Sequence, residues 1–128
     1  MFELQINEKV YQFKFGMGFL REVNKQYQKE IEGIKDKKDE IGLQMMVMGL
    51  KSGATEFLVE VLYAANFGQN PRLTKKVLDD YIDDECEDIG ALFESVIDFL
   101  KEANATKKIV NQVLENLAKA EAREKAEA

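Results

Sequence analysis

The first fifteen residues alternate twice between apolar and polar side chains, and this pattern constrains the fold more than any other feature of the sequence. The apolar members of the two runs are Phe2, Leu4, Ile6, Tyr11, Phe13 and Phe15. A period of two predicts two β-strands that each bury one face. With Asn7 and Glu8 as a two-residue turn, Leu4 pairs with Tyr11 and Phe2 pairs with Phe13. Because a lone hairpin is marginally stable in water, we expect it to pack on the rest of the chain or to pair with another copy.

The rest of the chain has helical periodicity, with apolar residues three and four positions apart. The predicted helices cover residues 19–32, 41–50 and 56–66, a segment after Thr74, residues 89–103, and a segment after Thr106. Four residues precede helices as predicted N-caps, namely Thr55, Thr74, Asp88 and Thr106. A charge-dense connector, residues 35–40, separates the first two helices. The sequence therefore predicts an α+β fold: a mostly α-helical, compact multi-helix domain with an N-terminal β-hairpin.

The length of 128 residues is ordinary for one domain. Apolar periodicity stops after Ala118, and the remaining residues have high helix propensity but no large apolar side chain. We expect a single domain over residues 1–118, with the hairpin in residues 1–15. Residues 119–128 are then a projecting or frayed helical tail.

The segment from Ile41 to Leu50 is apolar on every side of a helix, with only Gln44 polar between Gly42 and Gly49. A helix of this kind is typically buried on every side, and this one is too short to cross a bilayer. Two interpretations remain open. The segment is a central core helix, or part of its methionine surface meets another chain, because flexible thioethers adapt to varied partners.

Composition disfavours several classes of function. The net charge of −6 opposes binding to phosphate backbones, so we expect no nucleic-acid partner. No run reaches the length of a membrane span and no basic-then-apolar secretory signal opens the chain, so we expect no membrane partner. The sequence has no histidine, one cysteine (Cys86), and no P-loop or dinucleotide fingerprint. We therefore expect no enzyme activity, catalytic residue, metal or cofactor.

Seven acidic residues crowd one stretch of the chain: Asp79, Asp80, Asp83, Asp84, Glu85, Glu87 and Asp88. An EF-hand loop requires glycine at its sixth position. Counting from Asp79 or from Asp83 places Asp84 or Asp88 there instead. The pattern favours a solvated acidic turn.

Several whole segments carry a family resemblance. The hairpin runs into Gly-Phe-Leu-Arg-Glu-Val-Asn at residues 18–24, Ile-Gly-Leu-Gln-Met-Met-Val-Met-Gly-Leu spans residues 41–50, and two turns lie at residues 70–74 and 81–84. Together these segments resemble the tail assembly chaperones of long-tailed bacteriophages and prophages of Gram-positive bacteria, over most of the chain up to about residue 118. The turn departs from the expected Asn-Gly, so Glu8 must take a positive φ in a type I′ turn or the loop must be longer.

The resemblance implies a non-enzymatic protein of the infected bacterial cytoplasm. Such chaperones bind the long helical tape measure protein and keep it soluble before tail tube subunits polymerise around it. They are absent from the mature virion, and many are also made in a longer, frameshifted form.

The hairpin and the methionine-rich segment supply the predicted protein interface. Its residues are Phe2, Leu4, Tyr11, Phe13, Met45, Met46 and Met48. We also expect a homo-oligomer, because hairpin edges carry unpaired backbone groups. Two alternative functions remain, a structural tail protein retained in the virion and a small acidic regulatory protein. A regulator acting on DNA needs a basic face, for which Lys75 and Lys76 beside the acidic turn are poor candidates.

Overall fold

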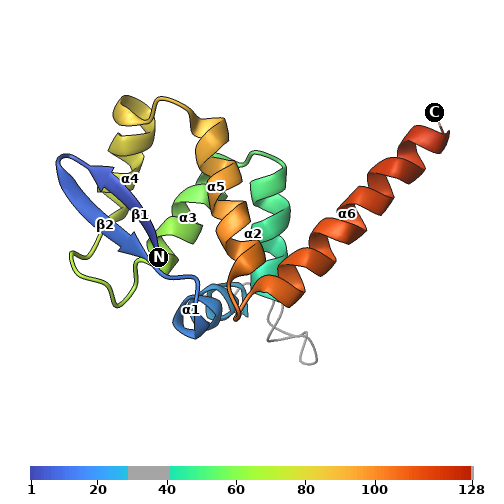
Figure 1. Cartoon of the computed structure of the whole chain (residues 1–128), viewed down its shortest axis with the longest axis horizontal. Helices are drawn as coiled ribbons and strands as arrows, with labels where there is room; N and C mark the ends of the chain where they lie inside the picture. Colours follow the sequence, from blue (N-terminus) through green and yellow to red (C-terminus); the bar gives the residue numbers. More distant parts are fainter. Residues whose placement is uncertain (29–40, 128) are drawn as a thin grey trace.

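The computed structural model describes residues 1–28 and 41–127. The elements are β1 (Phe2–Ile6), β2 (Lys9–Phe13), α1 (Met17–Gln28), α2 (Ile41–Lys51), α3 (Thr55–Ala65), α4 (Lys75–Asp80), the π-helical turn η1 (Tyr81–Glu85), α5 (Ile89–Glu102) and α6 (Lys107–Glu127). Figure 1 shows the hairpin at one side of a group of helices, with α6 extending away from the opposite side. The predicted α+β class, mostly helical with an N-terminal hairpin, is confirmed. The predicted connector at residues 35–40 and the end of the first predicted helix lie outside the described residues.

The hairpin has the predicted register. Phe2 is opposite Phe13 and Leu4 is opposite Tyr11. Asn7 and Glu8 form the turn with φ values of 50° and 67°, so Glu8 does adopt the left-handed conformation that a type I′ turn requires. The hairpin packs on the helices, and Lys14 at the end of β2 donates its backbone N–H to the Ala65 carbonyl oxygen at the end of α3 (2.8 Å). The marginal stability of an isolated hairpin is thereby overcome by packing within the chain.

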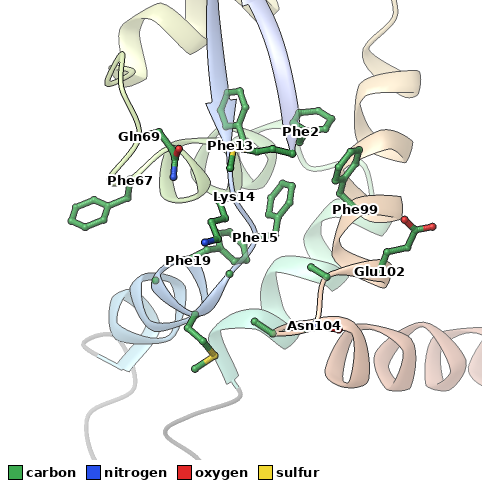
Figure 2. A pocket seen from close by; sticks show the side chains of 16 residues that line it. Phe2, Phe13, Lys14, Phe15, Phe19, Phe67, Gln69, Phe99, Glu102 and Asn104 are labelled. Atoms are coloured by element: carbon green, nitrogen blue, oxygen red, sulfur yellow. The ribbon is translucent and has the colours of Figure 1, made fainter.

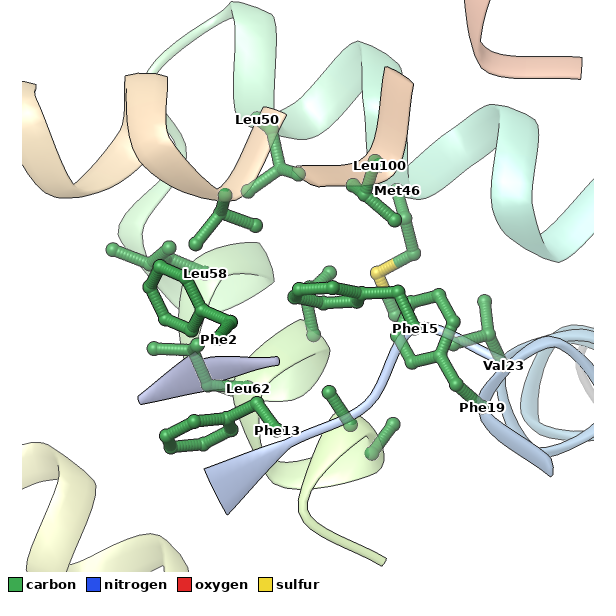
Figure 3. Packing of buried hydrophobic residues seen from close by; sticks show 14 of the residues in the cluster. Phe2, Phe13, Phe15, Phe19, Val23, Met46, Leu50, Leu58, Leu62 and Leu100 are labelled. Carbon is green, nitrogen blue, oxygen red and sulfur yellow. The ribbon is translucent and has the colours of Figure 1, made fainter. Parts of the chain in front are cut away.

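One hydrophobic core joins the hairpin to the helices. Aromatic rings from the hairpin meet aliphatic side chains of the helices, as Figure 3 shows. Fully buried members include Phe13, Val23, Met46, Leu58, Leu62, Val96, Leu100 and Val110. Because these residues come from β2, α1, α2, α3, α5 and α6, the core fixes the hairpin and five helices relative to one another.

The predicted helix caps have different outcomes. Thr74 and Asp88 are confirmed: their side-chain oxygens accept from the backbone N–H of Val77 (3.2 Å) and Ala91 (3.0 Å). The prediction for Thr55 is wrong, because α3 already begins at Thr55 and its N-cap is Ala54, which has no side-chain acceptor. Thr106 directly precedes α6, and its hydroxyl donates to the Leu100 carbonyl oxygen (2.7 Å), which ties the end of α5 to the start of α6.

Helix α2 is not buried on every side, and that expectation is wrong. Met46 is fully buried, whereas Met45 and Met48 are 38% and 52% exposed. The buried sides of α2 pack against α1, α3, α5 and α6. Gly42 allows the close approach of α1, since a Cβ there would lie 2.5 Å from the Val23 carbonyl oxygen. At Gly49 the close neighbour is the side-chain ring of Phe57, not another backbone.

Helix α6 extends beyond the hydrophobic core. Val110 is fully buried, Leu117 is half-buried, and residues 118–126 are exposed. Figure 1 shows this part of the helix pointing away from the other elements. The division into a domain ending near residue 118 and a separate tail stays a prediction. Within the described part of the chain, no helix combines the length and apolar character that crossing a membrane requires.

Candidate protein-binding site

A groove of about 1000 Å³ opens where the end of the hairpin meets the start of α1 and the junction of α5 with α6. Its lining comes from residues 1–2, 13–19, 67, 69, 99 and 102–105. We call this surface the phenylalanine groove, because six of its lining residues carry phenyl rings, namely Phe2, Phe13, Phe15, Phe19, Phe67 and Phe99. Figure 2 shows these rings arranged around the end of β2, with Phe67 and Phe99 on opposite sides.

The hairpin, the segment that follows it and α1 build the floor of the groove from core residues. Phe2 packs edge-on against Phe13, with ring centroids 5.7 Å apart, and Phe15 packs edge-on against Phe19 at 5.2 Å. All four side chains are buried. Their rings are therefore held in fixed orientations by the same contacts that stabilise the fold.

The rims of the groove are exposed. Phe67 is 58% exposed on the loop after α3, and Phe99 is 39% exposed on α5. Phe99 still touches the floor, since its ring centroid lies 5.0 Å from that of Phe2. Met17, at the first position of α1, is also half exposed. Exposed apolar side chains gathered around one groove make this surface a candidate for a protein-binding site.

Only two charged side chains are among the residues that line the groove, and they lie on different walls. Lys14 lies on the α1 side and Glu102 lies on the α5 side, with Phe15 and Phe99 between them in Figure 2. The aliphatic part of Lys14 lies close to Gly16, where a Cβ would be 3.2 Å from the Lys14 Cε atom. The groove is therefore mainly apolar, with one positive and one negative side chain at its edges, and the α-amino group of Met1 is also part of its lining.

The structure separates the seven residues of the predicted interface. Phe2 and Phe13 come together in the floor of the groove. Tyr11 of β2 and Met46 of α2 are buried in the hydrophobic core, and Leu4 of β1 is half-buried and packs against this core. Met45 and Met48 are exposed on α2 and do not line the groove. The interface itself stays a prediction.

Sequence reasoning did not single out the rim residues Phe67 and Phe99. Phe99 gave no separate signal, because it lies seven residues after Leu92 and three after Val96 and so continues the apolar spacing of its helix. Phe67 lies in the polar loop Asn-Phe-Gly-Gln-Asn-Pro, where no helical or strand periodicity calls for an aromatic residue. A large apolar residue that the periodicity of its element does not explain is a candidate for an interface.

The acidic turn holds no metal-binding group: among the described residues, no cluster of three or more potential ligands has the required geometry. The residues Tyr81–Glu85 form the π-helical turn η1, and the Glu85 carboxylate accepts from the backbone N–H of Asn7 in the hairpin turn (3.3 Å). Burial, the neighbouring Cys86 thiol and the Glu85 carboxylate raise the pKa of Tyr81 to about 12. The acidic turn therefore contacts the tip of the hairpin.

The raised pKa of Tyr81 predicts a loss of stability at alkaline pH. An unfolded tyrosine ionises near its ordinary pKa of 10.0, whereas folded Tyr81 retains its proton until about pH 12. The contribution of Tyr81 is thus fully present below about pH 10 and is lost between about pH 10 and 12. Urea unfolding of the wild type and Tyr81→Phe across this range is expected to show a shallower decline for the variant. Parallel declines would contradict the prediction.

Comparison with known proteins decides the family. A family model described as phage tail assembly chaperone protein matches residues 3–115. The chain belongs to this family. No curated protein and no solved structure matches it. The matched segment of this tail assembly chaperone includes the hairpin from Glu3 onward and α6 as far as Glu115. It also includes the residues that line the phenylalanine groove, except Met1 and Phe2. The prediction of a Gram-positive origin remains untested.

Proposed function

We propose that this tail assembly chaperone binds the tape measure protein and keeps it soluble until tail tube subunits polymerise. The observation that supports the proposal is the phenylalanine groove, in which two exposed phenyl rings stand above a buried aromatic floor, in an acidic chain of net charge −6. A long helical partner has apolar stripes that aggregate in water unless they are covered. The proposal places the protein in the cytoplasm of the infected bacterium and leaves it out of the mature virion. It requires binding and release, with no catalytic step.

Co-expression tests this function. The tape measure protein is expected to remain in the soluble fraction when it is expressed with the chaperone and to precipitate when expressed alone. Because apolar contact is little affected by moderate salt, whereas exposed ion pairs are screened over about 8–10 Å, the complex is expected to survive moderate salt. A tape measure protein that stays insoluble with the chaperone, or a complex that dissociates as salt rises, would contradict this mechanism.

Self-association is part of the proposal. Within the described residues, β1 and β2 pair only with each other, so each strand has an edge without a strand partner. Such edges can accept a strand of a second copy, and the exposed face of α2 with Met45 and Met48 is a second possible contact. Light scattering at rising concentration is expected to show species larger than a monomer. A uniform monomer throughout the micromolar range would count against self-association.

The alternative of a structural tail protein has a direct test. Mass spectrometry of purified virions is expected to lack this chain if it acts only during assembly. Its recovery at a fixed number of copies in each virion would favour the structural alternative.

A further inference from the structure

We propose that the phenylalanine groove binds one amphipathic helix, whose apolar ridge has an acidic residue on one flank and a basic residue on the other. This inference rests on the tape measure binding proposed above and names the chemistry of the segment that is bound. The groove accordingly selects both the type of helix and the direction in which it lies.

The backbone around the groove favours a helix over an extended peptide. An extended peptide needs free N–H and C=O groups on a strand edge. Two such groups at the groove end of β2 are already used: the N–H of Lys14, which follows the strand, donates to the Ala65 carbonyl oxygen (2.8 Å), and the Gln12 carbonyl oxygen accepts from the Asn66 side-chain amide (2.9 Å). A helix satisfies its own backbone groups and can therefore cover an apolar surface without leaving any of them unpaired.

The apolar part of the groove fits the ridge of a helix. The exposed rings of Phe67 and Phe99 stand on opposite sides, and the buried ring of Phe15 lies between them. Side chains at positions i, i+3 and i+7 of a partner helix can enter between such rims and meet the rings below. Gly18 leaves space for them on the α1 side, because a Cβ at this position would have no neighbour within 4 Å.

The charges on the two walls give the groove a polarity. On one wall the Lys14 ammonium lies near the start of α1, whose first N–H groups, those of Met17 and Gly18, have no acceptor within the helix. Both features favour a negative group on the partner. On the other wall Glu102 favours a positive group. A helix with unlike flanks satisfies both walls in one direction only, since turning it around exchanges its flanks.

Binding of synthetic helices tests this polarity. Three peptides of about 18 residues, or about five turns, share one leucine ridge and differ only in their flanks. One has glutamate on one flank and lysine on the other, the second has lysine on both, and the third has glutamate on both. Wild-type protein is expected to bind the mixed peptide about two- to fivefold more tightly than either of the others, which is the range for exposed ion pairs.

Charge reversal on each wall is expected to change the preference. Lys14→Glu should favour the all-lysine peptide, and Glu102→Lys should favour the all-glutamate peptide. Lys51→Glu is the matched control, because it alters the net charge as Lys14→Glu does but lies at the end of α2, away from the groove. The proposed polarity would be overturned if wild type showed no preference for the mixed peptide. It would also be overturned if Lys51→Glu changed the peptide preference in the same way as Lys14→Glu.

Filling the groove tests its location. Gly18→Trp places a large side chain in open space, so it is expected to preserve folding and to weaken binding of the mixed peptide about tenfold or more. Gly18→Ala is its control and should bind within about twofold of wild type. Phe67→Ser, which truncates an exposed ring, should also weaken binding, whereas Val10→Ser on the exposed face of the hairpin should not.

Co-expression separates this inference from the proposed function. If wild type and Gly18→Trp both keep the tape measure protein soluble, chaperone function stands and the groove is the wrong site. If wild type itself fails to keep it soluble, the proposed function fails. If only Gly18→Trp fails while its unfolding midpoint is unchanged, both are supported.

Discussion

Asn66→Ala is expected to lower the free energy of unfolding by about 2–6 kcal/mol. Asn66 is fully buried, and its amide nitrogen donates to the Gln12 carbonyl oxygen (2.9 Å) while its amide oxygen accepts from the Leu73 backbone N–H (2.6 Å). Alanine would leave both backbone groups without these partners, and each unsatisfied buried group costs about 1–3 kcal/mol. Since domains are stable by only about 5–15 kcal/mol, the loss would be a large fraction of the total.

Urea denaturation measures this loss, and Asn116→Ala provides the control. Asn116 is exposed on α6, where its side chain accepts from Gln112 (3.1 Å). Truncation at an exposed site of this kind changes stability by about 0.5 kcal/mol or less. A loss below about 1 kcal/mol for Asn66→Ala would mean that Asn66 does not hold the hairpin and the loop after α3 together. Such a result would also remove the support for a fixed position of the neighbouring Phe67.

The fold was largely predictable because local patterns determine it. Period-two alternation around Asn7 and Glu8 predicted the strands and their register, and apolar spacing predicted the helices. The cap at Thr55 failed because the preceding residue, Ala54, already occupies the extended cap position. A threonine near a helix start does not by itself identify which residue is the first with helical geometry.

The groove was not predictable, because it forms between segments that are distant in the sequence. Phe2 and Phe99 are brought within 5.0 Å by tertiary packing, and no local period reports on that contact. The bonds made by Asn66 are equally non-local, since they join it to Gln12 and Leu73. The polar composition of residues 66–70 predicts a loop and gives no indication of which polar side chain is buried.

Met46→Ala is expected to lower the free energy of unfolding by about 2–5 kcal/mol, the usual cost of truncating a buried methionine. Met46 is fully buried on α2, and the residues around it can close only part of the cavity that alanine would leave. Met45 and Met48, on the same helix, are 38% and 52% exposed. Alanine at Met48 is therefore expected to change stability by about 0.5 kcal/mol or less, with a slightly larger effect at Met45.

The three variants also distinguish a core residue from an interface residue, because they apply the same chemical change to one helix. Melting temperature and oligomer size are to be measured on each. If the exposed face of α2 contacts a second copy, Met48→Ala and Met45→Ala should retain the stability of the monomer and reduce the oligomer size at a given concentration. Met46→Ala should reduce the melting temperature at every concentration, including those at which wild type is monomeric. An equal loss of stability from all three substitutions would contradict the arrangement of α2, and unchanged association in Met45→Ala and Met48→Ala would leave the free edges of the hairpin as the contact between copies.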